Sequence, residues 1–466
     1  MSTDPTTTSQ VQAYRFMLRR MQSALVRKDA VMLHEPMRHH LRATAVGLIL
    51  GMFGLAAFFV VGRFSPTSDV SANEIVIGDP SGAVFVVQGD PLKLIPVPNV
   101  TSARLLVAAI APGREAPAAQ RVADTALANL GRLPATGLPG APPLPAPENL
   151  IKGVWSVCDA PGPQPSTTVL VQERAPATRP LTDDQALLVA EPNTGVTYLV
   201  WRAGRARIDP RESAIQNYYR LGNVVPRKVS ANLLNAIPEG RPLTLPVIPP
   251  ARPFPELPGA QVGDVVRMKG VRDSYFLLLP EGKQLVEPAV VDLIRYQRSK
   301  SPEPTTVTPE AIARVPEAPV ESQLDFDGFP ARVPQILKNT DASTVCLTWQ
   351  DPNQPAVITL NPEGLPLANG QSPVAIPSPA VSSQTADFVF LHPTKGALVR
   401  GVVPGQRSGS GAIWLVTDQG FRHGVPSIEV ARSLGLGETP APAPEPILAL
   451  LPIGDSLDPD LLTPNP

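Results

Sequence analysis

The strongest feature of the hydrophobic pattern is a run of 20 residues without a charge, at 43–62. At 1.5 Å per residue, a helix of this length spans the roughly 30 Å hydrocarbon core of a bilayer. A buried core helix would show a polar stripe, and none is visible. A cleaved signal peptide is the alternative, but 42 residues precede the run and no small-x-small cleavage site follows it. The pattern therefore predicts one transmembrane helix at 43–62.

The segment before this run, 1–42, has helical periodicity with apolar and basic residues on different faces. The apolar face would contain Val11, Tyr14, Leu18, Met21 and Leu25. A basic amphipathic helix can lie on anionic headgroups or dock on a partner protein, and composition does not decide between these. For docking, the candidate contact residues are Tyr14, Arg15, Leu18, Arg19 and Arg20.

After the apolar run, one pattern occurs four times, near 82–107, 195–222, 274–296 and 411–437. Each copy has an aliphatic or aromatic strand, a turn glycine, a shorter second strand and a proline that opens a helical segment. Glycine supplies the positive φ that tight hairpins need, and the turn glycines are Gly89, Gly204, Gly282 and Gly420. Proline loses no hydrogen bond at the first helical position, which is expected for Pro98, Pro210, Pro288 and Pro426. The pattern predicts four β-hairpin–helix repeats whose glycines and prolines serve architecture.

Strand-like runs separated by proline, glycine and aspartate predict a central β domain, from about 150–180 and 339–406. Connections rich in proline and alanine, such as 111–149, 236–260 and 300–321, are expected to be extended and semi-rigid. The body at 63–437 is therefore expected to be elongated and α+β in class. The proline-rich tail at 438–466 shows no credible core and is expected to be disordered or laid along a partner.

Composition and charge indicate in which compartment each part of the chain lies. The 58 prolines, about one residue in eight, agree with small cores between irregular connections. A formal net charge of −1 gives no basic field for nucleic acid. Seven cations lie before the apolar run, and Arg63 is the only one shortly after it. By the positive-inside rule, the N-terminus is cytoplasmic and the body is exported from a single-pass anchor in the inner membrane.

The two cysteines, Cys158 and Cys346, both lie in the exported part, each in a strand-like run. In an oxidising compartment a structural disulfide is the favoured interpretation. The alternative is a reactive thiol pair, which would need a close CxxC-type spacing that the sequence lacks.

Motifs for catalysis are absent from the sequence. A phosphate-binding loop needs G-x-x-x-x-G-K-[ST], but Gln284 follows Gly282-Lys283 and Leu277 stands at the first glycine's position. The five histidines form no H-x-x-x-H or Cys/His cluster, and there is no G-x-S-x-G elbow. We therefore predict no catalytic, cofactor-binding or metal-binding residue, and a scaffold role.

The opening stretch VQAYRFMLRRMQSALVRKDAVMLHEPMRHHLRA (11–43), followed at once by one membrane helix, resembles the EccB family of type VII (ESX) secretion systems. The repeats, with phrases such as VARSLGLG (430–437), the two distant cysteines and the Pro/Ala-rich end are similar to that family over nearly the full length.

The resemblance implies a structural subunit of a secretion complex in the inner membrane, which helps to form or gate the periplasmic side of its pore. Its implied partners are EccC, EccD and EccE, other copies of itself in a sixfold complex, the lipid membrane and, indirectly, the secreted ESX substrates. The family is often labelled an ATPase, so ATP hydrolysis remains the alternative function and ATP the alternative cofactor.

Overall fold

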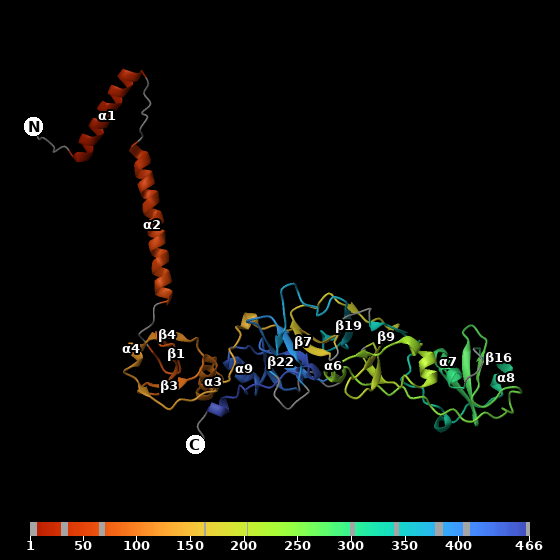
Figure 1. Cartoon of the computed structure of the whole chain (residues 1–466). Helices are drawn as coiled ribbons and strands as arrows, with labels where there is room; N and C mark the ends of the chain where they lie inside the picture. The colour runs from red at the N-terminus through yellow and green to blue at the C-terminus, as the bar shows by residue number, and fades with distance from the viewer. Residues whose placement is uncertain are drawn as a thin grey trace, which may run out of the picture. The chain divides into compact units, whose positions relative to one another are not determined.

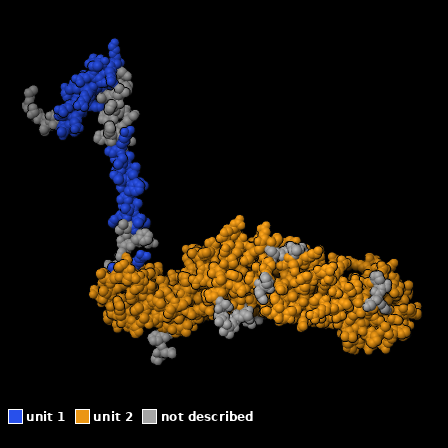
Figure 2. Space-filling view, viewed as in Figure 1, with its two compact units in different colours: residues 1–69, 121–123 blue, residues 70–120, 124–466 orange. Residues whose placement is uncertain are grey.

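The computed structural model describes residues 7–28, 36–64, 70–162, 165–202, 204–298, 303–339, 344–377, 385–403 and 411–462. Parts of the predicted cytoplasmic segment (1–6 and 29–35), parts of the predicted central domain and the last four residues of the tail lie outside these ranges. The chain forms two compact units, residues 1–69 with 121–123 and the remaining residues (Figure 2).

The first unit contains two single helices, α1 (Thr8–Arg27) and α2 (Pro36–Phe64) (Figure 1). At the start of α1 the Gln10 side chain accepts a hydrogen bond from the Thr7 backbone N–H at 3.0 Å. Lys28, in the left-handed conformation with φ 55°, ends the helix. The helix α2 contains the apolar run and extends beyond both ends of the predicted span.

A seven-stranded sheet forms the centre of the second unit, with strand order β20-β21-β7-β6-β18-β19-β8. Its strands are β6 (Val154–Ala160), β7 (Ser166–Gln172), β8 (Arg179–Pro180), β18 (Thr344–Trp349), β19 (Val357–Asn361), β20 (Val374–Ala375) and β21 (Phe388–Leu391). All seven come from the two stretches predicted for a central β domain. The segment 396–402, also within the predicted range, belongs instead to a different sheet.

Four smaller sheets share one topology, and we call the segments that form them modules 1 to 4 (75–132, 185–239, 265–317 and 396–453). In each, three antiparallel strands are followed by a helix, a fourth strand that neighbours the first, and a second short helix. An extended residue after that helix then pairs with the third strand in parallel. Each module is therefore about twice as long as the hairpin–helix phrase that the sequence predicted.

The elements of modules 1 and 2 follow this order. Module 1 contains β1 (Ile75–Asp79), β2 (Val84–Gln88), β3 (Lys93–Val97), α3 (Val100–Ile110), β4 (Gln120–Ala123), α4 (Asp124–Leu127) and β5 (Gly131–Arg132). Module 2 contains β9 (Gln185–Ala190), β10 (Thr197–Trp201), β11 (Gly204–Arg207), α5 (Ser213–Tyr218), β12 (Arg227–Lys228) and α6 (Ala231–Ala236).

Modules 3 and 4 repeat the order. Module 3 contains β13 (Val265–Met268), β14 (Ser274–Leu279), β15 (Gly282–Val286), α7 (Pro288–Gln297), β16 (Thr305–Val307) and α8 (Pro309–Ala313). Module 4 contains β22 (Gly396–Val402), β23 (Ile413–Thr417), β24 (Arg422–Val425), α9 (Ile428–Ser433), β25 (Ala441–Pro444) and α10 (Glu445–Leu448). Module 2 also contains the 3₁₀ turn η2 (Leu221–Asn223), and β17 (Gln335–Ile336), from beyond module 3, pairs with β9 in its sheet. Outside the modules lie the 3₁₀ turns η1 (Pro147–Asn149), η3 (Val320–Ser322) and η5 (Pro459–Leu462).

The expectation of a disordered tail at 438–466 is wrong for its described part, 438–462. This segment supplies β25 and α10, which complete module 4, and the turn η5. Prolines are tolerated in β25 because it is the edge strand of its sheet and needs its N–H groups on one side only. The tail is anchored by buried side chains, namely Ala443, Ile447, Leu448, Leu451 and Leu457.

The modules pack in pairs. In modules 2 and 3, α5 packs on α7, and Leu293 joins Tyr218 and Tyr219 in one core. In modules 1 and 4, α3 packs beside α9, where an Arg104 Nη donates to the Leu434 carbonyl at 2.9 Å (Figure 1). Modules 2 and 4 also share the largest hydrophobic core with the central sheet.

Candidate functional site

The helix α1 presents its predicted contact residues to solvent. Tyr14 is 68% exposed and Leu18 40%, and Met21 and Leu25 on the same face are 59% and 80% exposed. The basic residues Arg15, Arg19 and Arg20 are exposed as well. No residue of α1 is buried. The helix therefore contributes to no core of its own chain, as expected for a surface that binds a membrane or a partner.

The helix α2 is long and apolar enough to span a bilayer. Its window Arg42–Val60 has a mean hydropathy of 2.2, and none of the window is buried within the chain. Large apolar side chains such as Phe53, Phe58 and Phe59 are more than 70% exposed. In water such exposure would be costly, so the helix needs an apolar environment or protein partners.

Cys158 and Cys346 are joined as a disulfide in the central sheet. They are direct cross-strand partners on β6 and β18, and both are buried. Trp155 and Trp349, which precede and follow the cysteines by three residues, are also opposite each other in this register. The bond is structural, and neither thiol is free to react.

The turn glycines differ among the modules. Gly89, Gly282 and Gly420 have positive φ values of 85°, 150° and 84°. At Gly282 an added Cβ would lie 2.4 Å from the Pro316 carbonyl oxygen, so only glycine fits. Gly204 was expected to supply the turn of module 2, but it is the first residue of β11, and the positive φ belongs to Arg202.

The prolines open a helix in only one module. Pro288 is the first residue of α7, as expected. Pro98 and Pro426 instead precede the N-cap residues Asn99 and Ser427, and Pro210 lies two residues before the N-cap of α5. In α3 and α9 the N-cap side chain accepts a hydrogen bond from a backbone N–H of the first turn, which stabilises the start of each helix.

Sequence reasoning missed a cation that lies over an aromatic ring in every module. The pairs, with distances to the ring centroid, are Arg132 over Phe85 (5.9 Å), Arg205 over Tyr198 (5.1 Å), Lys283 over Phe276 (5.7 Å) and Arg422 over Trp414 (4.6 Å). The ring comes from the second strand each time. The signal in modules 2 to 4 was a basic residue at the start of the third strand, diagonally opposite that ring. In module 1 the cation comes from β5 instead.

Lys283 lies in the fragment that came nearest to a phosphate-binding loop. Its ammonium group donates to the carbonyls of Ile312 and Val315, both at 2.9 Å, and lies 3.4 Å from a carboxylate oxygen of Glu317. The side chain is buried under α8. This lysine holds module 3 together and is not presented to a phosphate.

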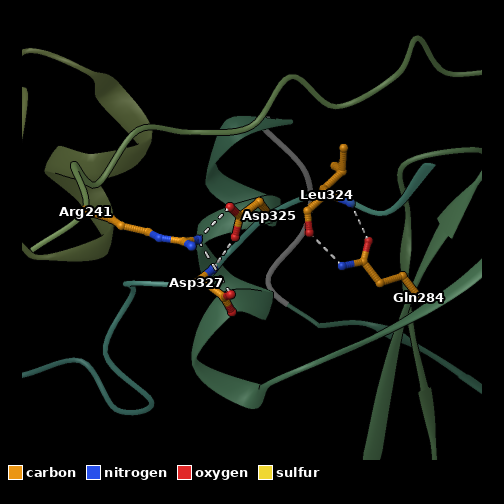
Figure 3. A network of polar contacts seen from close by, with 5 residues as sticks. All are labelled: Arg241, Gln284, Leu324, Asp325 and Asp327. Carbon is orange, nitrogen blue, oxygen red and sulfur yellow. Dashed lines mark hydrogen bonds and ion pairs between the residues drawn. The ribbon is translucent and has the colours of Figure 1, made fainter. Parts of the chain in front are cut away.

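A network of polar contacts joins the segment after module 3 to Arg241, which follows module 2, and to β15 of module 3 (Figure 3). An Arg241 Nη lies 3.1 Å from an Asp325 oxygen and 3.7 Å from an Asp327 oxygen. The Gln284 amide donates to the Leu324 carbonyl at 2.7 Å and accepts from its N–H at 2.9 Å. These contacts place the segment that returns from module 3 along β15, and a groove of about 470 Å³ lies beside it.

Asp159 is a buried carboxyl group where module 2 meets the central sheet. Its oxygens accept hydrogen bonds from the Ser230 N–H, from the Ser230 hydroxyl at 2.8 Å and from the Thr167 hydroxyl at 3.1 Å. Burial raises its pKa to about 6, against the lowering effect of these bonds, and Asp387 nearby raises it further. Because Ser230 is also the N-cap of α6, the carboxyl group positions that helix.

Among the described residues, no group of three or more His, Cys, Asp or Glu side chains could hold a metal ion. His423 is buried, its ring Nδ1 lies 2.9 Å from the Asp455 carbonyl oxygen, and burial lowers its pKa. It packs the end of module 4. Asp159, Lys283 and His423 therefore all have hydrogen-bond partners within the chain.

Comparison with known proteins places the chain in a family. Residues 3–461 match the family described as "Type VII secretion system ESX-1, transport TM domain B". The chain is 31% identical to the ESX-3 secretion system ATPase EccB3 of Mycolicibacterium smegmatis, over 97% of this chain and 89% of the relative. It is 29% identical to the ESX-5 secretion system ATPase EccB5 of Mycobacterium tuberculosis, over 97% and 92%.

Solved structures give the same result. The fold matches a chain in an intact ESX-5 inner membrane complex with a TM-score of 0.70 at 26% identity, over 100% of this chain and 96% of that one. It also matches a chain of the EccB3 dimer from the ESX-3 core complex with a TM-score of 0.66 at 28% identity, over 84% and 100%.

Proposed function

Because the chain belongs to the EccB family of type VII secretion systems, we propose that it is a non-catalytic structural subunit of an ESX inner membrane complex. The observation that carries the proposal is the pairing of an unburied apolar helix, α2, with a large body built from modules and a central sheet. The four modules are repeats of one unit, and their surfaces contact neighbouring subunits on the periplasmic side of the pore, which they help to form or gate.

The orientation follows from charge. The cations before α2 keep the N-terminus in the cytoplasm, so α2 anchors the chain as a single pass and the body lies in the periplasm. The partners are EccC, EccD, EccE and other copies of the chain in a hexameric complex. Two related structures support assembly, since one is an inner membrane complex and the other an EccB3 dimer. Secreted substrates are contacted indirectly, and no nucleic acid is bound.

The exposed helix α1 is the docking element on the cytoplasmic side. Its apolar face contains Tyr14 and Leu18, and its basic face contains Arg15, Arg19 and Arg20, all accessible in the isolated chain. Deletion of residues 1–35 should abolish co-purification of the other membrane subunits while the body stays folded. Retention of the intact complex by this truncation would contradict the docking role.

ATP hydrolysis is the second candidate, because the curated relatives carry the word ATPase in their names. The sequence lacks a phosphate-binding loop, and Lys283 is committed to backbone carbonyls of module 3. Purified full-length protein should therefore hydrolyse ATP no faster than a mock preparation. A rate above that background that is lost in one single-site variant and kept in a matched surface variant would establish an ATPase instead.

A further inference from the structure

Module 1 contains an apolar groove that its packing leaves open. The groove lies between α3, the segment that follows β5, and the turn η5 near the C-terminal end of the described chain. Its volume is about 650 Å³, which lies within the roughly 300–1,000 Å³ typical of ligand sites. Its lining includes Ile95, Leu106, Ile110, Leu133, Leu461 and Leu462.

The lining of this groove is less polar than that of the groove beside β15. None of the described residues that line it carries a charge, and only Gln88 and Thr136 have polar side chains. By contrast, the groove beside β15 is lined by Glu287, Asp325 and Asp327, among others. A site with so few polar groups cannot orient a charged or strongly polar ligand, so it favours an apolar one.

The groove has a buried wall and an exposed rim. Ile95, Leu106 and Leu462 are only 5%, 5% and 3% exposed, whereas Leu461 beside them is 59% exposed. The wall is therefore fixed by the core of module 1, and the rim leaves apolar surface in water. An apolar occupant would remove that surface from water and would cover only two polar side chains, Gln88 and Thr136.

Module 1 is also the first module after the membrane helix in the sequence. The helix α2 ends at Phe64 and β1 begins at Ile75. At about 3.5 Å per residue, the intervening chain reaches at most roughly 40 Å even when fully extended. An apolar groove tethered this closely to a bilayer meets lipid chains at high local concentration.

We propose that this groove binds one acyl chain of a membrane lipid, taken from the leaflet in which the C-terminal end of α2 lies. The inference rests on the proposed function in one respect, namely that α2 is inserted in a membrane. Bound lipid would hold module 1 at the bilayer surface, and through α3 and α9 it would fix the position of module 4 as well.

The test uses the full-length chain in nanodiscs of palmitoyl-oleoyl phosphatidylethanolamine and phosphatidylglycerol. A small fraction of the lipid is a phosphatidylcholine with a photoactivatable diazirine near the end of one acyl chain. After irradiation and proteolysis, mass spectrometry maps the lipid adducts. We expect adducts on peptides that contain 106–110 or 461–462, in addition to those from α2.

Two variants and one control make the result specific. Ala109→Trp fills the groove, and Leu461→Asp places a charge at its rim, where the 59% exposure of Leu461 means that folding should be unaffected. Each should reduce the groove adducts roughly tenfold, the equivalent of 1.4 kcal/mol, and leave α2 adducts unchanged. Val247→Trp, at a position 85% exposed in another part of the body, should change neither.

The outcomes distinguish the two claims. Adducts confined to α2, or groove adducts that persist in both variants, would overturn lipid binding and leave the membrane anchor intact. The absence of adducts on groove peptides is also the result expected if another protein segment fills the groove, and it would overturn lipid binding in that case too. A lack of adducts on α2 itself would overturn the anchoring that the proposed function requires, and the lipid site with it.

Discussion

Cys158 on β6 lies directly opposite Cys346 on β18, with their Cα atoms 4.0 Å apart although 188 residues separate them in sequence. Between the two cysteines the chain forms β7, β8 and the whole of modules 2 and 3, and then returns to the central sheet. The disulfide therefore joins the two ends of the segment that contains modules 2 and 3. Trp155 and Trp349 also lie opposite each other on β6 and β18, and both pack into the core that the central sheet shares with modules 2 and 4.

Replacement of both cysteines by serine should lower stability substantially. The loop-closure model gives an upper figure of about 5 kcal/mol for so long a loop, and native disulfides usually contribute about 2–4 kcal/mol. We expect a lower unfolding temperature and faster proteolysis within 180–340 for the double variant. Wild-type protein refolded in reductant should behave like the variant, and the variant itself should not respond to reductant. Equal stability of variant and wild type would contradict a structural role for the bond.

Asp159 predicts a specific pH dependence. Its folded-state pKa of about 6 lies above the ordinary value of 3.8, so the folded state holds an extra proton between these values. The free energy of unfolding contributed by this group should therefore fall as pH rises from about 4 to about 6, by about 3 kcal/mol, and stay level above that. The unfolding temperature, measured from pH 4 to pH 7, reports this fall.

The control for Asp159 is Asp159→Asn, which cannot ionise. Other carboxyl groups titrate in the same range, so the prediction concerns the difference between the two proteins: the wild type should lose stability relative to the variant as pH rises from 4 to 6. Parallel pH profiles for both proteins would show that Asp159 does not hold the extra proton.

Leu448→Ala tests the corrected position of the C-terminal segment. Leu448 on α10 is fully buried in the core shared by module 4 and the central sheet, so truncation should cost about 2–5 kcal/mol. Leu461→Ala, at a position 59% exposed, should change stability by less than about 0.5 kcal/mol. Unfolding temperatures of the two variants provide the comparison. A harmless Leu448→Ala substitution would favour the disordered tail that composition alone suggests.

Single cysteines test the membrane orientation, because both native thiols are bonded to each other. Val247 is 85% exposed in the body and Ser9 is exposed on α1. In intact cells a membrane-impermeant maleimide should label Val247→Cys but not Ser9→Cys. Permeabilised cells should show both. Labelling of Ser9→Cys alone in intact cells would reverse the orientation.

The sequence predicted the parts of the fold whose signals are local. The run at 43–62 identifies the membrane helix because 20 uncharged residues in a row match the thickness of a bilayer and exceed what most buried helices need. The hairpins of the modules were visible because an apolar strand, a turn and a second strand follow one another within about 15 residues. The strands of the central β domain were recognised for the same reason. The disulfide between two of them was instead inferred from the oxidising compartment expected for the body.

The second half of each module was not predicted, because its signals are weak and its partners distant. β25 has the sequence Ala-Pro-Ala-Pro, which lacks the β-branched and aromatic residues typical of strands. It is a strand because β22, some forty residues earlier, offers a free edge. The connections at 111–149 and 300–321 were expected to be extended linkers because they are rich in proline and alanine. They contain β4, α4, β16 and α8.

The cation over each aromatic ring was also missed, since the two residues lie on different strands and only the register brings them together. The docking residues of α1 are a different case. The structure shows that Tyr14 and Leu18 are exposed, but their role depends on a partner outside the chain.

The central claim, that the chain is a structural subunit which joins the complex through its membrane-side elements, is tested most directly by co-purification. The variant Leu18→Glu with Met21→Glu places two charges on the apolar face of α1, and Gln12→Glu with Ser23→Glu places them on the opposite face as a control. We predict that wild type and control retain the other ESX membrane subunits after detergent extraction, whereas the apolar-face variant loses them although its body stays folded. Retention of those subunits by the apolar-face variant would contradict the account.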